Sequence, residues 1–423
     1  MKNLYLILSI ALTSAVLVVH NVVDVELPHL IMGILLAIPL FILPYRQYIC
    51  YLFFTIPITF GVHGIYTILL AGSLILRLKN KTTSQYLIIL IFLFLEITSM
   101  AFGYVGQVQI VEIVMYISNI TVFILTLFYI SDEESYSNCI RYYCYGMGLT
   151  LTVLYLRAFL VSDMLTDDIL SGQMRSGVTM GNDGDVVKTS TYIEANANTV
   201  AFYAITLYST LLVGISRLGI NKVVYTLLIV ISIAAGIMSF SRTWLMLALS
   251  LTTIYFLSSK GKNKLAFLLV LVPLVLVILS SNQILNSVSD AYTTRFEESS
   301  FQTAGGRTLL FDEYNNFLFN NPQYIPIGTG VINYKEICMC SNSIHCGLQQ
   351  IYICQGLVGV LLFVLICAMF AQRCVKSKIK FVQCLPLLSV FIFNQTIQML
   401  NPYALILPFV CAAYVLKLDY KKS

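Results

Sequence analysis

An arginine stands between two apolar runs of the sequence, in the stretch 239–244 that also holds the only tryptophan of the chain. A guanidinium near an apolar interior is costly unless it faces a partner or a watery cavity, and it binds phosphate well in a bidentate manner. Arg242 therefore predicts an anion-binding position. The plainer alternative is that this arginine and Trp244 only anchor a helix hairpin at the level of the lipid headgroups.

A second arginine, Arg307, follows two glycines and precedes the sequence TLLFD at 308–312. Glycines before an arginine let both the backbone and the side chain approach an anionic ligand closely. The pattern after it predicts a short amphipathic helix through Tyr314 and Phe317 that lies along a membrane surface. The alternative is an ordinary surface loop with a solvated arginine.

A third candidate is His345, just before an apolar run that contains the sequence QGLVG at 355–359. A histidine acts as a general base near neutral pH, although a single histidine at a helix start is more often structural. The four histidines show no paired-ligand spacing and no glycine-rich nucleotide loop is present. The sequence therefore predicts neither a metal nor another cofactor.

Further polar residues are weaker candidates. The charged residues of one long polar segment, which could contact a polar ligand or simply be solvated, are Arg175, Asp183, Asp185, Lys188 and Glu194. Asn198 opens the next apolar run, where an asparagine can also serve as a helix cap. Glu96 and Glu112 lie within apolar runs, so each is expected to be a buried, hydrogen-bonded carboxyl or to mark a pathway.

The elements that carry these residues are predicted from composition. Hydrophobic residues make up 58% of the 423 residues and charged residues only 11%, against about 25% charged residues in a soluble domain. The run 265–279 is apolar on every side, whereas a membrane barrel alternates apolar and polar positions. We therefore expect an all-α polytopic membrane protein whose single transmembrane domain covers 1–423, with about 12–14 spans at roughly 20 residues each.

Fourteen apolar runs are candidate spans, at 4–19, 27–43, 48–59, 64–76, 86–104, 110–130, 141–160, 197–215, 221–238, 243–258, 264–281, 349–371, 381–397 and 403–416. The first run is expected to be a retained span, because no clear cleavage site for a signal peptide follows it. The pair 48–59 and 64–76 is split by a Gly-Val-His-Gly sequence. Its two members are kept as separate segments, although together they could form a hairpin that does not cross fully.

The distribution of lysine and arginine predicts the orientation. With the N-terminus in the cytoplasm, 18 of the 25 basic residues fall inside and 7 outside, as expected because basic residues accumulate in cytoplasmic loops. Both termini are then cytoplasmic. The two long polar segments, 162–196 and 282–346, become exterior loops, and Arg242, Arg307 and His345 share the exterior face. Cys338, Cys340 and Cys346 fall in the second loop, where two of them could form a disulfide.

Taken in order, these motifs resemble the O-antigen polymerase and O-antigen ligase superfamily, which are bacterial membrane glycosyltransferases of the GT-C type. The resemblance covers about 196–372 and rests on Asn196 and Asn198, Ser241-Arg242-Thr243, Gly306-Arg307, Pro322, Gly328-x-Gly330, His345 and the sequence GLVG at 356–359. Members of the family often have asparagine directly after the histidine, where this chain has Cys346.

The resemblance implies a metal-independent, inverting glycosyltransferase without a cofactor, whose donor is an oligosaccharide on undecaprenyl diphosphate. Arg242 and Arg307 would bind the diphosphate, and His345 would activate or orient the acceptor hydroxyl. We expect a Wzy-type polymerase of O-antigen or capsule repeat units at the outer face of the bacterial inner membrane, with a chain-length regulator as a possible partner. The alternatives are the ligase that transfers finished glycan to lipid A-core and, from another class, a flippase or transporter. No nucleic acid is expected as a partner.

Overall fold

The computed structural model describes residues 4–23, 25, 27–60, 64–77, 83–103, 110–128, 133–160, 179–180, 186–187, 197–214, 217–239, 241–258, 307–332, 334–340, 344, 346–375, 381–397, 400 and 408–418. Nearly all of these residues are helical. The exceptions include one antiparallel pair of two-residue strands, β1 (Thr179–Met180) and β2 (Val186–Val187).

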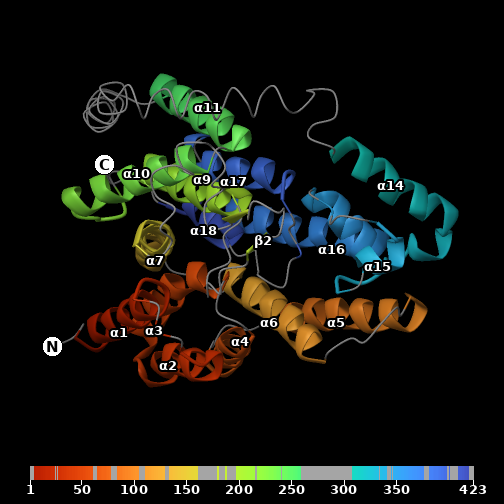
Figure 1. Ribbon diagram of the computed structural model, residues 1–423, viewed down its shortest axis with the longest axis horizontal. Helices are drawn as coiled ribbons and strands as arrows, with labels where there is room; N and C mark the ends of the chain where they lie inside the picture. Colours follow the sequence, from red (N-terminus) through yellow and green to blue (C-terminus); the bar gives the residue numbers. More distant parts are fainter. Residues whose placement is uncertain are drawn as a thin grey trace.

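The described residues of the N-terminal part form seven α-helices and one 3-10 helix: α1 (Leu4–Asn21), α2 (His29–Ile42), α3 (Tyr45–Thr55), η1 (Ile56–Phe60), α4 (Ile65–Arg77), α5 (Thr83–Gly103), α6 (Ile110–Leu127) and α7 (Glu133–Leu160). The C-terminal part contains α9 (Ala197–Gly214), α10 (Lys222–Met238), α11 (Arg242–Ser258), α14 (Arg307–Asn320), η3 (Pro322–Tyr324), α15 (Tyr334–Cys338), α16 (Gly347–Val375), α17 (Phe381–Asn394) and α18 (Pro408–Val415). The first six helices lie on one side of the molecule and α9, α10, α11, α16, α17 and α18 on the other, with α7 packed between them (Figure 1).

The helices follow the apolar runs of the sequence. Thirteen of the fourteen predicted segments coincide at least in part with a described helix, and the remaining one, 264–281, lies outside the described residues. Three described helices are long and apolar enough to cross a bilayer, namely Leu4–Asn21, Ile110–Leu127 and Gly347–Gln372. Shorter apolar helices accompany them. The architecture is thus compatible with a helical membrane protein, and the number of crossings stays a prediction.

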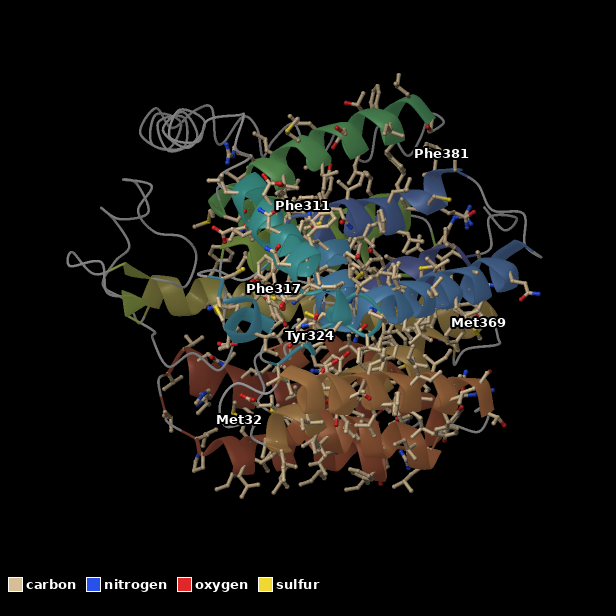
Figure 2. All side chains as sticks on the ribbon, turned by 90° about the vertical axis from the view of Figure 1, so that its right-hand side faces the viewer. Met32, Phe311, Phe317, Tyr324, Met369 and Phe381 are labelled. Carbon is tan, nitrogen blue, oxygen red and sulfur yellow. The ribbon has the colours of Figure 1, made fainter. Side chains whose placement is uncertain are left out.

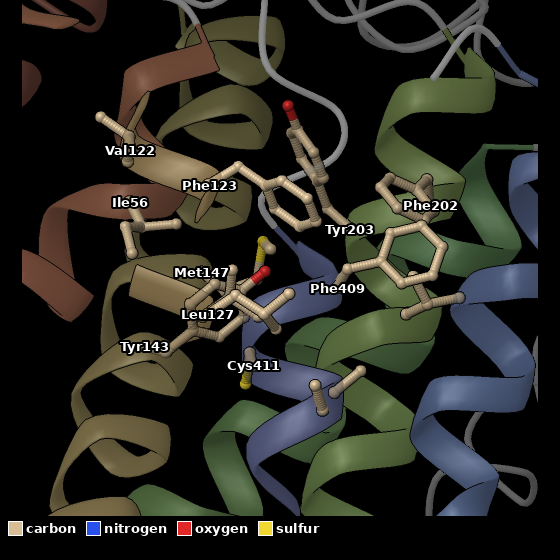
Figure 3. Close-up of a cluster of buried hydrophobic side chains, with 14 of the residues drawn as sticks. Ile56, Val122, Phe123, Leu127, Tyr143, Met147, Phe202, Tyr203, Phe409 and Cys411 are labelled. Atoms are coloured by element: carbon tan, nitrogen blue, oxygen red, sulfur yellow. The ribbon is translucent and has the colours of Figure 1, made fainter. Parts of the chain in front are cut away.

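Large side chains from helices of both halves of the chain fill the core between the two sides of the molecule (Figure 3). Phe123 from α6, Tyr143 from α7 and Tyr203 from α9 are almost completely buried, as is Cys411 from α18. Burial of aromatic side chains provides a large share of packing energy. This core joins the N-terminal helices to the C-terminal helices that carry most of the candidate site.

The helices α3 and α4 form an antiparallel pair that starts and ends at one end of the bundle. The hydroxyl groups of Tyr48, near the start of α3, and Ser73, near the end of α4, are hydrogen bonded. Arg77 then donates to the carbonyl oxygens of Leu40 and Leu43 at the end of α2, each at 2.8 Å. The separation of 48–59 from 64–76 is therefore confirmed as two distinct helical segments.

Candidate functional site

The Tyr225 hydroxyl near the start of α10 donates to the Leu211 carbonyl near the end of α9, and Gly236 near the end of α10 lies against Trp244 in the first turn of α11. Helices α9 and α11 therefore run in the same direction, and their first turns lie at the same end of the bundle. The hydroxyl groups of Tyr208 in α9 and Thr252 in α11 are hydrogen bonded. Tyr208 lies ten residues after Asn198, and Thr252 lies ten residues after Arg242. Because a helix rises about 1.5 Å per residue, Asn198 and Arg242 each lie about 15 Å from this bond along their own helix. The structure thus brings Asn198 and Arg242, both half-buried, to one level.

Helix α17 runs antiparallel to α9 and ends at the level where α9 begins. The Phe202 and Phe393 rings lie 5.7 Å apart between centroids. One turn or more further into the bundle, the Ser389 hydroxyl donates to the Ser209 hydroxyl at 3.1 Å. The end of α17 therefore lies beside the start of α9.

Helix α16 begins where α17 ends. The Cys346 thiol donates to the Gln395 side-chain oxygen at 3.5 Å, and the Leu400 N–H donates to the Gln350 side-chain oxygen at 2.7 Å. The starts of α9, α11 and α16 and the end of α17 consequently share one end of the bundle, which we call the site end. His345 lies outside the described residues, but the residue after it, Cys346, is at the site end.

The turn between α10 and α11 holds Arg242 in place as the first residue of α11. The Ser239 hydroxyl donates to the Gly236 carbonyl at 2.6 Å and accepts from the Ser241 N–H at 3.3 Å, while the Ser241 hydroxyl accepts from the Trp244 N–H at 3.4 Å. The last bond caps α11. A Cβ on Gly236 would lie 1.8 Å from the Trp244 ring, so the indole packs directly on the α10 backbone. Arg242 is thus held at the positive end of a helix, where an anion is favoured.

Helix α16 is broken at Gly356, whose φ of 61° and ψ of −161° are not helical. The break frees carbonyl oxygens at the end of the first half of the helix, and the turn after η3 supplies their donors. The Thr329 N–H donates to the Ile353 carbonyl at 2.9 Å, and the Gly330 N–H donates to the Cys354 carbonyl at 2.8 Å. The first half of α16 is therefore capped by a segment more than 20 residues earlier in the chain.

The second half of α16 is capped by the same turn. The Leu357 N–H donates to the Ile325 carbonyl at 2.9 Å, and the Val358 N–H donates to the Pro326 carbonyl at 3.1 Å. The segment 325–330 thus satisfies backbone groups on both sides of the break. This arrangement fixes the first half of α16, and with it the residues next to position 345, relative to the turn.

Glycines allow these two stretches of backbone to cross. A Cβ on Gly328, which has a φ of 75°, would lie 2.3 Å from the Cys354 carbonyl carbon, and a Cβ on Gly356 would lie 2.4 Å from the Pro326 carbonyl carbon. Neither position has room for a side chain, and both have a backbone conformation that favours glycine. The pattern Gly328-x-Gly330 and the glycine at 356 are thus parts of one crossing.

Glu96 of α5 holds the turn from the other side. Its buried carboxylate accepts hydrogen bonds from the Val331 N–H at 2.9 Å and from the Ile332 N–H at 3.2 Å. One turn along α5, the Ser99 hydroxyl donates to the Ile327 carbonyl at 3.3 Å. The prediction of a buried, hydrogen-bonded carboxyl is confirmed for Glu96.

Helix α6 supports the break at a second point. The Gln355 amide, directly before the break, donates to the Tyr116 hydroxyl. The amide oxygen of Gln355 is buried and has no hydrogen-bond partner among the described residues. Glu112, one turn before Tyr116, is exposed in the first turn of α6. The prediction of a buried carboxyl is therefore wrong for Glu112, because its helix begins with polar and apolar side chains that face outward.

The helix that begins at Arg307, α14, packs on α16 and on η3. The Gln349 amide donates to the Phe311 carbonyl at 3.1 Å, and the Phe317 and Tyr324 rings lie 5.5 Å apart between centroids. Figure 2 labels Phe311, Phe317 and Tyr324 on the side of the molecule where α14 lies. The predicted helix through Tyr314 and Phe317 is confirmed, and through Gln349 it is tied to the first half of α16 at the site end.

Buried aromatic and thiol groups fill the space under α14. The Tyr314 and Tyr334 rings lie 5.9 Å apart between centroids. Burial raises the pKa of both the Tyr314 hydroxyl and the Cys338 thiol, so both stay protonated at neutral pH. Cys338, Cys340 and Cys346 are free thiols in the structure, and a disulfide among them is not formed there.

The structure describes only some of the predicted site residues. Arg175, Glu194 and His345 lie outside the described residues, while Arg307 is described as the first residue of α14. Asn198 is the second residue of α9 and is therefore not its cap, because the helix begins at Ala197. The sequence analysis did not predict the roles of Tyr116 and Gln355. The only sequence signal of the crossing that these two residues support is the set of glycines at 328, 330 and 356.

Within the described parts of the chain, no group of three or more histidine, cysteine, aspartate or glutamate side chains could hold a metal ion. No protein family, curated protein or solved structure matches the chain. The site is therefore defined by its own geometry: two half-buried polar residues, Asn198 and Arg242, at the starts of parallel helices, beside a broken helix that carries α14.

Proposed function

We propose that the chain is a membrane glycosyltransferase that polymerises oligosaccharide repeat units carried on undecaprenyl diphosphate. The observation that carries the proposal is the common position of Asn198, Arg242 and the start of α16 at one end of the bundle. Arginine-bearing helix starts favour a diphosphate, because guanidinium groups and helix N-termini both stabilise negative charge.

The proposed reaction is a single displacement. The acceptor hydroxyl attacks the anomeric carbon of the donor sugar, the bond from that carbon to the diphosphate oxygen breaks, and undecaprenyl diphosphate leaves with the bonding electrons. Arg242 and Arg307 stabilise the charge that grows on the leaving group, which a metal ion does in many other transferases. His345 takes the proton of the acceptor hydroxyl.

The charges at the opposite end of the bundle support the proposed orientation. There the Ser137 hydroxyl, near the start of α7, donates to the Arg217 carbonyl just before α10. Arg141 lies one turn further along α7, and Arg77 binds the end of α2. Basic residues at this end fit a cytoplasmic face, so the site end faces the exterior in the proposal.

Substitution of Arg307 and Arg242 by alanine tests the proposal in cells, with the surface glycan read as a ladder on a gel. We expect the transfer rate of either variant to fall by about 10²–10³-fold, so that single repeats attached to the core replace the ladder. Long chains stranded on the carrier lipid would instead identify the ligase. The matched control is Arg46→Ala, an exposed arginine in the first turn of α3 at the opposite end, which should leave the ladder unchanged. An unchanged ladder in both site variants would refute the proposal.

A further inference from the structure

The turn that crosses the broken helix is held by the N-terminal half of the chain. The contacts come from α5 and α6: Glu96 and Ser99 bind the turn, and Tyr116 binds Gln355 beside the break. These residues are more than 200 positions away from their partners in the sequence. The candidate site end therefore depends on contacts outside the 196–372 region.

Among these contacts the Glu96 carboxyl group accepts the largest number of hydrogen bonds. Its Oε1 lies 3.1 Å from the Val331 nitrogen and 3.2 Å from the Ile332 nitrogen, while its Oε2 lies 2.9 Å from the Val331 nitrogen. Both oxygens thus face backbone donors. Hydrogen bonds at such a buried position are costly to lose, because a buried donor left without its acceptor has no water to replace it.

The turn in turn positions α14 and the first half of α16. Thr329 and Gly330 cap the first half of α16, and Gln349 in that half donates to the Phe311 carbonyl of α14. The path from Glu96 to the helix that begins at Arg307 therefore runs through three sets of hydrogen bonds. Arg242, on α11, is held by its own turn and does not share this path.

We propose that Glu96 is a positioning residue for glycan transfer: its carboxylate fixes the turn 327–332 in the break of α16 and so sets the place of α14 relative to Arg242. The inference rests on the proposed function. A displacement of a reacting group by about 1 Å can cost about 10²-fold in rate. A loosened turn should therefore lower turnover without removing the diphosphate contact made by Arg242.

Glu96→Gln is the direct test, because it keeps the shape of the side chain and removes one acceptor. In either orientation the amide nitrogen faces the Val331 N–H, so a donor meets a donor. The full chain is purified in detergent, and maleimide labelling of each cysteine is read by peptide mass spectrometry. Cys354 lies behind the turn and Cys144 lies in α7, and both are completely buried. We expect Cys354 to label about tenfold faster in the variant and Cys144 to stay protected, as for a local opening.

Turnover is measured in the same preparations with a lipid-diphosphate-linked oligosaccharide and is divided by the number of donor-binding molecules. We expect kcat to fall by about 10- to 100-fold with the donor KM within about threefold of the wild type. Glu112→Gln, the same substitution at an exposed carboxyl group in the first turn of α6, is the matched control and should change both readouts by less than about threefold. Unchanged Cys354 labelling and unchanged kcat in Glu96→Gln would overturn the proposal.

Two further outcomes are decided by the same design. If Cys144 also labels in Glu96→Gln, the variant is globally unfolded, and Glu96→Asp replaces it, since this variant keeps the acid group and draws it back from the Val331 and Ile332 N–H groups. Protected Cys354 and unchanged kcat in Glu96→Asp would then count against the proposal. If the wild type transfers no glycan, the proposed function fails, while the labelling of Cys354 still decides whether Glu96 anchors the turn.

Discussion

Alanine at position 356 should destabilise the protein strongly, because the break in α16 requires glycine for two separate reasons. The φ of 61° and ψ of −161° belong to a region that is almost exclusive to glycine, and a non-glycine residue held there costs about 1–3 kcal/mol. The added Cβ would also lie 2.4 Å from the Pro326 carbonyl carbon and 2.5 Å from the Ile327 nitrogen. These backbone atoms cannot move without disturbing the bonds from Leu357 and Val358 to the turn.

Each of those two hydrogen bonds contributes about 0.5–1.5 kcal/mol. Together with the strained backbone, their loss gives an expected decrease of about 2–6 kcal/mol in the free energy of unfolding. The assay is thermal unfolding of the detergent-solubilised chain, followed by the exposure of buried thiols. We expect the Tm of Gly356→Ala to fall by at least about 4 °C, given about 2–4 °C per kcal/mol in larger domains.

Gly72→Ala is the matched control for this prediction. Gly72 lies within α4, and among the described residues no atom outside the adjoining helix lies within 4 Å of the position of an added Cβ. Alanine there should be neutral or stabilise the helix by up to about 1 kcal/mol. A Tm of Gly356→Ala within about 1 °C of the wild type would show that α16 tolerates a continuous helix at this point and would refute the reasoning.

Three further predictions follow from other contacts. Gly236→Ala places a Cβ 1.8 Å from the ring of Trp244, which is the only tryptophan of the chain. The tryptophan fluorescence of this variant should therefore shift to the red, and its rate of glycan transfer should fall. An unshifted spectrum would contradict the packing of Trp244 on α10. Arg77→Gln removes donors to the C-terminal carbonyls of α2 and should lower the free energy of unfolding by about 1–3 kcal/mol, with turnover per folded molecule unchanged. Cys340, which is half-buried, should react with a water-soluble maleimide faster than buried Cys338. Because burial raises the pKa of both thiols, both labelling rates should rise from pH 7 to pH 9 as the thiolates form, and equal rates would contradict the described burial.

The helical segments could be predicted from the sequence, whereas the points at which a helix is interrupted could not. Apolar runs predicted the helices because membrane-like surroundings require continuous apolar side chains and internal backbone hydrogen bonds. The run 349–371 was predicted as one helix, yet it is broken at Gly356. The partners of the broken backbone come from 325–330, and a local pattern of hydrophobicity carries no information about such distant donors and acceptors.

The candidate site shows the same division. Arg242 and Asn198 were predicted from their positions before apolar runs, and the parallel course of α9 and α11 brings them to one level. The two carboxyl groups in apolar runs, Glu96 and Glu112, looked equivalent in the sequence. Only Glu96 is buried, because its partners Val331 and Ile332 lie more than 200 residues later in the chain. No local signal separates such a pair.

The most direct measurement of the proposed function uses the purified full chain in lipid vesicles with an undecaprenyl-diphosphate-linked oligosaccharide as the only substrate, in the presence of a metal chelator. Mass spectrometry then follows both the glycan and the carrier lipid. We expect products of two or more repeat units on one lipid, one free undecaprenyl diphosphate for each bond formed, and a loss of about 10²–10³ in rate for Arg242→Ala. Absence of longer glycans with the wild-type chain, or an equal rate with Arg242→Ala, would contradict the account.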